Sequence, residues 1–245
     1  METKSPDTFY QSSWNPESML WGDISGGMMR FNEIFENGLH ARYTYKSWNQ
    51  EWNTWADVSG NKRDGKASGS GFSRGCDRNQ NGWDGIVCSV RGNTNSRITF
   101  GPGSIPPTFT ICSVSRYNGP SRGRIINGDS NWLHGHWAGY VGVAYYEGWK
   151  TPVPSNPTPQ FDWLVFCGQN AHPNIFTANG KYVSNGAGGG RSNIAFGINS
   201  LGCCGVSEAS DWAVAEIAVW NRALDAEEMA LLTTHYKTYL VFYSS

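Results

Sequence analysis

One segment restricts the fold of this chain more than any other. Residues 212–220 read WAVAEIAVW, in which Trp, Val and Ile alternate with alanines and Glu216 is the one charged side chain. Such a composition is typical of a β-strand, and a strand that is apolar on both faces belongs inside a domain rather than at its edge. The segment therefore predicts a central strand.

A helix is expected directly after this strand. Asp225 can cap its first turn, and Glu228 occupies the reciprocal position of a capping box. Met229, Leu232 and Tyr236 then form one apolar stripe. Other short strands, separated by Gly, Asn and Pro turns, are expected within residues 39–46, 109–117, 123–126, 132–146 and 161–167. The Gly/Ser-rich residues 65–75 are expected to form a loop.

These elements predict an all-β chain, an antiparallel two-sheet sandwich with one short C-terminal helix. Residues 1–37 have weak periodicity and are interpreted as an N-terminal extension, whereas residues 38–245 form the sandwich domain. Twelve Trp and 14% aromatic residues compensate for a modest 39% hydrophobic content, because each aromatic side chain buries a large area.

Charge excludes some classes of function. With 16% charged residues and a net charge of −1, the chain has no broad basic field for nucleic acid. It also has no apolar run long enough for a bilayer span, so no membrane insertion is expected. The Gly- and Asn-rich composition and the even number of cysteines, six, favour an extracellular or cell-surface location.

Two stretches resemble laminin-G-like domains, members of the concanavalin A-like lectin/glucanase superfamily. Residues 55–65, WADVSGNKRDG, follow an expected strand and match Asp-x-Ser-Gly-Asn-x-x-x-Gly, while residues 215–229, AEIAVWNRALDAEEM, resemble the closing strand and helix. The resemblance implies a jelly roll of two stacked antiparallel sheets. Members of the superfamily bind glycans, matrix proteins or other ligands, often with Ca²⁺ at a loop rim, and related folds include glycoside hydrolases and lyases. The Trp- and Gly-rich middle departs from ordinary laminin-G domains.

The cysteines leave several pairings open. Cys76 and Cys88 enclose a polar turn that can fold back, so a disulfide between them is expected. Cys112 and Cys167 lie in the middle of strands, where they either pair across adjacent strands or act as small buried hydrophobes. Cys203 and Cys204 are adjacent, and pairing of one of them with another cysteine is left open.

The turn between Cys76 and Cys88 carries a candidate calcium loop. Its oxygen-bearing residues match the first half of the pattern Asp-x-Asn-x-Asn-Gly, but the bidentate Glu at the twelfth position is replaced by Cys88. The alternative is an Asx-rich turn held by the disulfide. The candidate metal ligands are Asp77, Asn79, Asn81 and Asp84.

No catalytic residue is predicted. Glycosidases need two carboxylates, and the Glu-x-Asp-x-x-Glu motif of hydrolases with the implied fold is absent. Glu216 stands alone in its strand and is expected to be structural. Ser73 lies in a Gly-x-Ser-x-Gly match but lacks the strand before it and the helix after it that a nucleophile elbow requires.

A mixture of aromatic and polar residues is the candidate ligand site. Trp132, His134 and His136 share one face of a strand. Trp rings can stack on the C–H faces of sugars, while His, Asn, Arg and Asp bind hydroxyl groups; the alternative is that the aromatics fill the core. The predicted ligand-binding residues are Arg116, Asp129, Asn131, Trp132, His134, His136, Tyr146, Trp149, Gln169 and Asn170.

Three functions from different classes follow. The first is a non-catalytic, lectin-like carbohydrate-binding module of a secreted or surface protein, with Ca²⁺ as the one cofactor considered. The second is a carbohydrate-active enzyme whose carboxylates, for example Asp129, Glu147 and Asp162, meet only in space. The third is an adhesion domain that binds another extracellular protein.

Overall fold

In the computed structural model, the chain divides into two compact units, Met1–Gly38 and Leu39–Ser245. The structure describes residues 20–24, 27–171, 173–200, 202 and 208–242. In the first unit, a hairpin of β1 (Leu20–Ile24) and β2 (Gly27–Arg30) is followed by α1 (Phe31–Glu36). All other elements belong to the second unit, and none of the described helices is long and apolar enough to cross a membrane.

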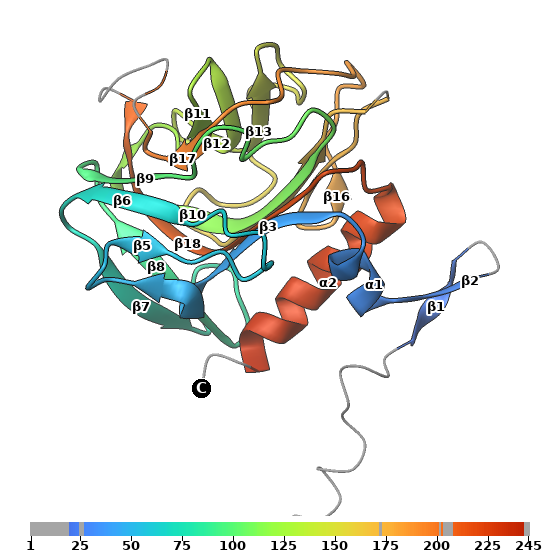
Figure 1. Cartoon of the computed structure of the whole chain (residues 1–245), viewed down its shortest axis with the longest axis horizontal. Helices are drawn as coiled ribbons and strands as arrows, with labels where there is room; N and C mark the ends of the chain where they lie inside the picture. The colour runs from blue at the N-terminus through green and yellow to red at the C-terminus, as the bar shows by residue number, and fades with distance from the viewer. Residues whose placement is uncertain (1–19, 25–26, 172, 201, 203–207, 243–245) are drawn as a thin grey trace, which may run out of the picture. The chain divides into compact units, whose positions relative to one another are not determined.

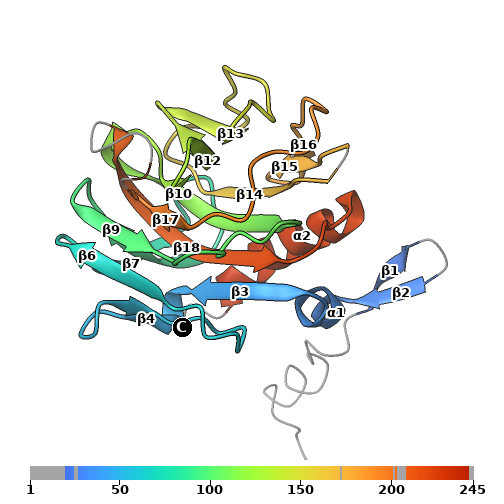
Figure 2. The same ribbon diagram turned by 45° about the horizontal axis from the view of Figure 1, so that its top comes forward.

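The second unit contains two antiparallel eight-stranded sheets and a C-terminal helix (Figures 1 and 2). Sheet I has the spatial order β16 (Lys181–Tyr182), β15 (Phe176–Ala178), β14 (Leu164–Gln169), β10 (Thr110–Arg122), β18 (Ser210–Trp220), β8 (Ile86–Gly92) and β7 (Ser73–Arg78), and β3 (Leu39–Thr44) also pairs with β18. Sheet II has the order β13 (Tyr140–Tyr146), β12 (Trp132–Trp137), β11 (Ile126–Gly128), β17 (Phe196–Ile198), β9 (Ser96–Thr99), β6 (Gly65–Gly69), β5 (Thr54–Trp55) and β4 (Trp48–Asn49). A 3₁₀ turn, η3 (Tyr45–Ser47), connects β3 to β4.

The predicted central strand is confirmed. β18 pairs with β10 along most of its length, with β8 in its first half and with β3 in its second half. The segments at Leu39 and Trp212, far apart in sequence, thus belong to one sheet. Val214, Ile217 and Val219 face the core, so the strand is buried as its sequence indicates.

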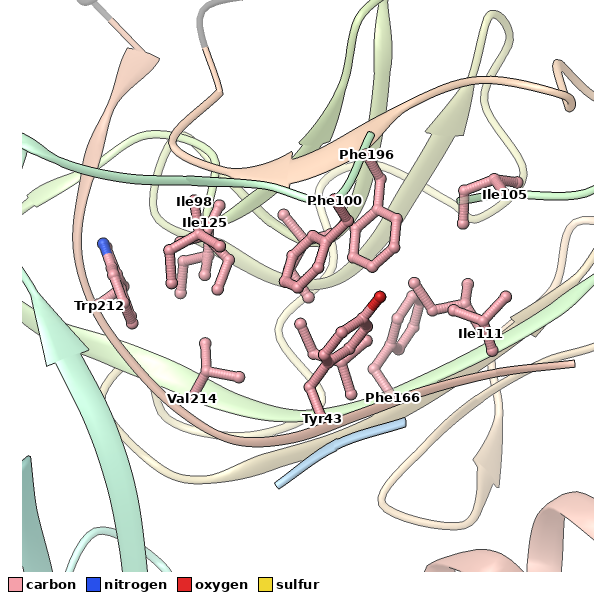
Figure 3. Close-up of a cluster of buried hydrophobic side chains, with 14 of the residues drawn as sticks. Tyr43, Ile98, Phe100, Ile105, Ile111, Ile125, Phe166, Phe196, Trp212 and Val214 are labelled. Atoms are coloured by element: carbon pink, nitrogen blue, oxygen red, sulfur yellow. The ribbon is translucent and has the colours of Figure 1, made fainter. Parts of the chain in front are cut away.

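Aromatic rings fill the space between the two sheets. Figure 3 shows Phe100 and Phe196, carried by the sheet II side, above Tyr43 and Phe166 of sheet I. The rings of Phe100 and Phe196 stack at 4.4 Å between centroids, and Tyr43 lies 4.2 Å from Phe100. Because each buried aromatic side chain removes a large apolar area from water, this cluster compensates for the modest aliphatic content.

The C-terminal helix α2 (Ala226–Phe242) begins with the predicted capping box. The Glu228 amide donates to Oδ1 of Asp225 at 2.9 Å, and the Asp225 amide donates to Oε2 of Glu228 at 3.0 Å. Met229, Leu232 and Tyr236 are buried, and Figure 1 shows α2 on the side of sheet I away from sheet II. The helix has 17 residues, so it is longer than the short helix that the sequence predicted.

Two disulfides join neighbouring strands of sheet I. Cys76 and Cys88 are opposite one another on β7 and β8, and Cys112 and Cys167 are opposite one another on β10 and β14. Both bonds therefore link residues that the sheet register had already brought together. Cys203 and Cys204 lie outside the described residues.

The Gly/Ser-rich segment differs from the loop that its composition predicted. Residues 65–69 form β6, and residues 73–78 form β7. A Cβ atom on Gly65 would lie 2.6 Å from Cε1 of Phe100, so glycine lets β6 approach the aromatic core. The strand pairs with β5 and β9, and these ladders outweigh the weak strand propensity of Gly and Ser.

A turn that follows β5 is tied to β3 through one carboxylate. Asp57 Oδ1 accepts hydrogen bonds from the amides of Arg42 and Ser59, both at 2.9 Å, and Oδ2 accepts from the amide of Arg63 at 3.1 Å. The Asn61 side chain donates to the Leu39 carbonyl at 2.9 Å. The Asp-x-Ser-Gly-Asn pattern is therefore a structural turn that attaches the edge of sheet I to the chain entering sheet II.

Replacing Asp57 with Ala is expected to lower the free energy of unfolding by about 1–2 kcal/mol, because three backbone N–H groups lose their acceptor. Urea denaturation followed by tryptophan fluorescence measures the change. Val58→Ala, which shortens an exposed neighbour, is the matched control and should change stability by less than about 0.5 kcal/mol. Equal effects of the two substitutions would contradict the role of the carboxylate.

Candidate functional site

A pocket of about 360 Å³ opens where several strands end at one edge of the sandwich. This volume lies within the range of roughly 300–1,000 Å³ that is usual for small-molecule sites. Its walls come from the turn after β8, the end of β10, the β12–β13 turn and the start of β18. We call it the rim pocket; its lining residues are Thr94, Ser121, Arg122, Gly123, Trp137, Ala138, Glu208 and Ala209.

The β12–β13 turn shapes one wall of the rim pocket. Trp137 and Tyr140 are paired across the two-residue loop of Ala138 (φ 51°) and Gly139 (φ 84°). Positive φ at both positions suits a tight hairpin turn, but for Ala it costs about 1–2 kcal/mol relative to a right-handed conformation. The turn places Trp137 at the pocket and leaves only a methyl group, that of Ala138, beside it.

Glu208 is held in place by three donors. Its carboxylate forms an ion pair with Nε of Arg124 and accepts a hydrogen bond from Nε1 of Trp137 at 3.3 Å. The Arg124 amide also donates to the Glu208 carbonyl at 2.6 Å, and Nη1 of Arg124 donates to Oδ1 of Asn131 at 2.9 Å. The pocket therefore presents an indole ring and a carboxylate in a fixed relative arrangement, with a guanidinium bracing the carboxylate.

Arg122 forms the opposite part of the wall. Its Nη1 donates to Oε1 of Gln160, and its Cζ lies 5.8 Å from the centroid of the Phe161 ring. The Gly139 amide donates to the Arg122 carbonyl at 2.8 Å, so the backbone of β10 is attached to the β12–β13 turn. Arg122 itself is exposed, which leaves its remaining N–H groups available to a ligand.

Further aromatic rings continue from Trp137 along β12 and β13. The Trp149 ring lies 5.3 Å from Trp137 and 5.1 Å from Tyr145, and Tyr140 lies 6.2 Å from Trp137. All four side chains are half-buried rather than part of the core. They form an apolar surface next to the rim pocket, which we call the aromatic surface.

Most of the predicted aromatic site lies elsewhere, in the core. Trp132 and Tyr146 stack at 4.5 Å with an interplanar angle of 6°, and His134 bonds to the Tyr146 hydroxyl at 2.9 Å through Nδ1 and to the Phe166 carbonyl at 3.2 Å through Nε2. These side chains are at most 1% exposed, so they do not reach a ligand at the surface. Trp132 and His134 lie on one strand face, as predicted, but this face points into the core, where the large rings are buried.

His136 is buried without a hydrogen-bond partner for either ring nitrogen. Its ring meets the edge of Tyr117 at 4.8 Å. Burial lowers the pKa of His134 and of His136 to about 3 each, and for His136 the neighbouring His134 lowers it further. Both imidazoles are therefore neutral in the folded protein at ordinary pH.

These buried histidines should make folding acid-sensitive. The unfolded chain protonates a histidine below its ordinary pKa of about 6.5, whereas the folded state resists protonation down to about pH 3, so stability falls as the pH drops through this window. His136→Leu should remove about 2 kcal/mol of the loss in unfolding free energy between pH 7 and pH 5. Val141→Ala, at the paired position on β13, removes no titrating group. A variant that keeps the wild-type pH dependence after loss of His136 would refute this origin.

The other predicted ligand residues are dispersed. Asn131 accepts a hydrogen bond from Arg124, which is paired with Glu208 of the rim pocket. Trp149 lies in the aromatic surface beside that pocket. Asp129 accepts a hydrogen bond from the Ala195 amide, while Asn170 bonds to the backbone of Pro107 and Phe109. The remaining two are buried: Gln169 binds the backbone of Ala171 and Pro173, and Arg116 is part of an ion-pair network.

That network is centred on Asp77, the first residue of the predicted calcium loop. Arg91 and Arg116 each contact a different oxygen of the Asp77 carboxylate at 2.9 Å, and the Trp163 indole donates to it at 3.2 Å. Burial on its own would raise the pKa of Asp77, but Arg116 and Arg91 bring it below its ordinary value. Two guanidinium groups thus supply the positive charge that a cation would supply.

The remaining loop residues do not complete a cation site. Asn79 Oδ1 accepts the Gly85 amide at 2.7 Å, and the carbonyl of Asn81 accepts the Trp163 amide at 2.8 Å. Asp84 is exposed, and in the described part of the chain no group of three His, Cys, Asp or Glu side chains is placed to hold a metal ion. The residues present do not fit Ca²⁺, because the buried carboxylate of Asp77 is already paired with two guanidinium groups and Asp84 is the one other charged residue of the set.

Asp77→Asn is expected to lower the free energy of unfolding by about 3 kcal/mol, because it leaves a buried guanidinium without its counter-charge. Asp84→Asn, in the same turn but exposed, should change it by less than about 0.5 kcal/mol. Thermal unfolding with and without EDTA completes the measurement. A calcium site would instead give a chelator-sensitive transition that both substitutions weaken.

The carboxylates considered for catalysis have different surroundings. Glu216 is 1% exposed and accepts a hydrogen bond from Nε of Arg42 at 2.7 Å, as a structural carboxylate does. Asp162 lies beside Gly82 in the Asp77 region, whereas Glu147 bonds through its amide to Asn131. Ser73 begins β7, an edge strand of sheet I, and is not followed by a helix.

Sequence reasoning missed Arg122, Trp137, Glu208 and Phe161. Each lies at the end of a strand or in a connection, and no motif joins them. Strand was expected within residues 132–146, and the turn at Ala138 and Gly139 was not predicted. The structure shows that Trp137 immediately precedes this turn, which places its side chain at the end of the sheet. Arg122 and Glu208 could not be assigned, because only the sheet register brings the ends of β10, β12 and β18 together.

No protein-family model matches this sequence, and no curated protein is significantly similar to it. Solved structures do share its fold. A Trypanosoma rangeli sialidase in complex with sialic acid aligns at 15% identity and a TM-score of 0.55, over 89% of this chain and 36% of the sialidase. Domain 4 of AbnA, a GH43 extracellular arabinanase from Geobacillus stearothermophilus in complex with arabinotriose, aligns at 14% identity and a TM-score of 0.57, over 80% of this chain and 98% of that domain.

The binding domain of Paraclostridial Mosquitocidal Protein 1 gives a similar result. It aligns at 16% identity and a TM-score of 0.58, over 83% of this chain and 53% of that chain. At these identities the likeness establishes a shared fold. This chain spans 36% of the length of the sialidase and 53% of the length of the mosquitocidal binding domain.

Proposed function

We propose that residues 38–245 form a non-catalytic carbohydrate-binding module with a concanavalin A-like jelly roll, and that it binds glycan in the rim pocket. The observation that carries the proposal is the arrangement of Trp137, Glu208 and Arg122 around one pocket of about 360 Å³. An indole ring can stack on the C–H face of a sugar, while a carboxylate and a guanidinium bind hydroxyl groups in defined directions.

The fold neighbours support a carbohydrate-related role. Two of them are parts of carbohydrate-active enzymes, and one of these, the arabinanase domain, was solved with arabinotriose. The match to that domain covers 98% of its length, so the comparable unit is a separate domain of the enzyme. This favours a binding module over a complete enzyme.

The chemistry of the pocket favours binding over hydrolysis. A glycosidase needs a proton donor and a second carboxylate on either side of the scissile bond. Glu208 is paired with Arg124 and accepts the Trp137 N–H, so its carboxylate oxygens are already engaged by neighbours in the protein. Glu208 is the one carboxylate among the lining residues, and Asp211, outside the lining, accepts the amide of Ser121 at 3.0 Å.

We place the protein outside the cell or on its surface. The two disulfides persist in oxidising compartments. Glycans and extracellular proteins are the partners that such a location offers, and the adhesion alternative is decided by the binding experiment below.

Trp137→Ala should weaken glycan binding at least about ten-fold, because the stacking surface is lost. A glycan array with the wild-type protein identifies the ligand, and calorimetry measures the variant. Trp52→Ala is the matched control, since Trp52 is 74% exposed in the β4–β5 hairpin and should not affect affinity.

The same array with EDTA tests the metal requirement, and we expect binding to persist. Loss of binding with EDTA would restore the calcium loop as a functional site. A wild-type protein that binds no glycan, but retains an extracellular protein in a sugar-insensitive manner, would replace this proposal with the adhesion function.

A further inference from the structure

An exposed aromatic ring, that of Phe161, lies next to a lining residue of the rim pocket without being part of the lining. Phe161 is 43% exposed, which is unusual for so large an apolar side chain in a domain that buries most of its rings. Arg122 lines the pocket, and its guanidinium lies 5.8 Å from the Phe161 ring centroid. Arg122 therefore connects the pocket to a second aromatic surface.

The segment that carries Phe161 is held in position before any ligand arrives. The Asp162 amide donates to the Pro159 carbonyl at 3.1 Å, and the Trp163 amide donates to the Asn81 carbonyl at 2.8 Å. Gln160 accepts a hydrogen bond from Arg122 on the other side of Phe161. A surface that is already ordered loses little conformational entropy on binding, as a ligand subsite requires.

The charges around this surface are balanced. Arg124 is paired with Glu208, and the carboxylate of Asp211 accepts the amide of Ser121, the residue before the exposed cation of Arg122. Asp162, next to Phe161, adds a carboxylate rather than a cation. Such a surface gives no electrostatic advantage to a sulfated, sialylated or uronic-acid chain.

We propose that the rim pocket and Phe161 together recognise a neutral oligosaccharide of at least two sugar units. One unit lies against Trp137 in the pocket, and the next lies on the Phe161 ring, with Arg122 and Gln160 binding hydroxyl groups between them. This inference rests on the proposed function and adds to it the class and minimum length of the ligand.

Calorimetry with a length series tests the proposal. The neutral probes are arabinose, arabinobiose and arabinotriose, together with glucose, galactose and xylose and their di- and trisaccharides; the acidic probes are sialyllactose and oligogalacturonate. We expect the affinity for the best neutral sugar to rise about ten-fold from one unit to two, equivalent to about 1.4 kcal/mol. The affinity should change less than about two-fold between low and high NaCl concentration.

Phe161→Ala should abolish the gain from the second unit and leave the affinity for the monosaccharide unchanged. Tyr182→Ala, which removes a 60% exposed ring at the far edge of sheet I, is the matched control and should alter neither value. Circular dichroism confirms that the variants are folded.

Three results would overturn the inference while leaving carbohydrate binding intact. These are tighter, salt-sensitive binding of the acidic probes, an affinity independent of chain length, and equal loss of mono- and disaccharide binding in Phe161→Ala. If neither panel nor the full array contains a ligand, the proposed function itself fails, which is a distinguishable outcome.

Discussion

The fold depends on the ladder that β18 forms with three other strands. Its pairing with β10, β8 and β3 brings together segments from the beginning, middle and end of the domain. One face of β18 carries Val214, Ile217 and Val219 into the core, while the other carries Glu216 to Arg42 on β3. Without this strand, sheet I would separate into three unconnected parts, namely β16-β15-β14-β10, β8-β7 and β3.

The need to fill that interior explains where the aromatic residues are. Two eight-stranded sheets enclose a wide space, and the aliphatic content of the chain is modest. Trp132, Tyr146 and Phe109 are therefore packed inside, with His134 satisfied by Tyr146 and Phe166. A second imidazole, that of His136, is also buried, and burial keeps it neutral by lowering its pKa.

The candidate site is a consequence of how strands end. Strands β10, β12 and β18 belong to two different sheets, yet their ends meet at one edge of the sandwich, where Arg122, Trp137 and Glu208 surround the rim pocket. The side chains there are not needed for the core, so they are available for recognition while the sheets behind them supply rigidity. The Asp77 network serves stability rather than recognition. Its carboxylate is paired with Arg91 and Arg116, and these ion pairs stabilise the outer region of sheet I.

The sequence by itself determined the elements whose signals are local. The apolar run at 212–220, the capping box at Asp225 and Glu228, and the Asp57 turn each depend on near neighbours, and each is present as predicted. Residues 65–78 became strands because their partners impose pairing that Gly and Ser do not favour on their own. The face that Trp132 and His134 occupy was predictable, but whether that face is buried depends on the second sheet. The rim pocket was decided only by tertiary structure, because its residues are separated by up to 115 positions, from Thr94 to Ala209, and meet through strand register rather than through any motif.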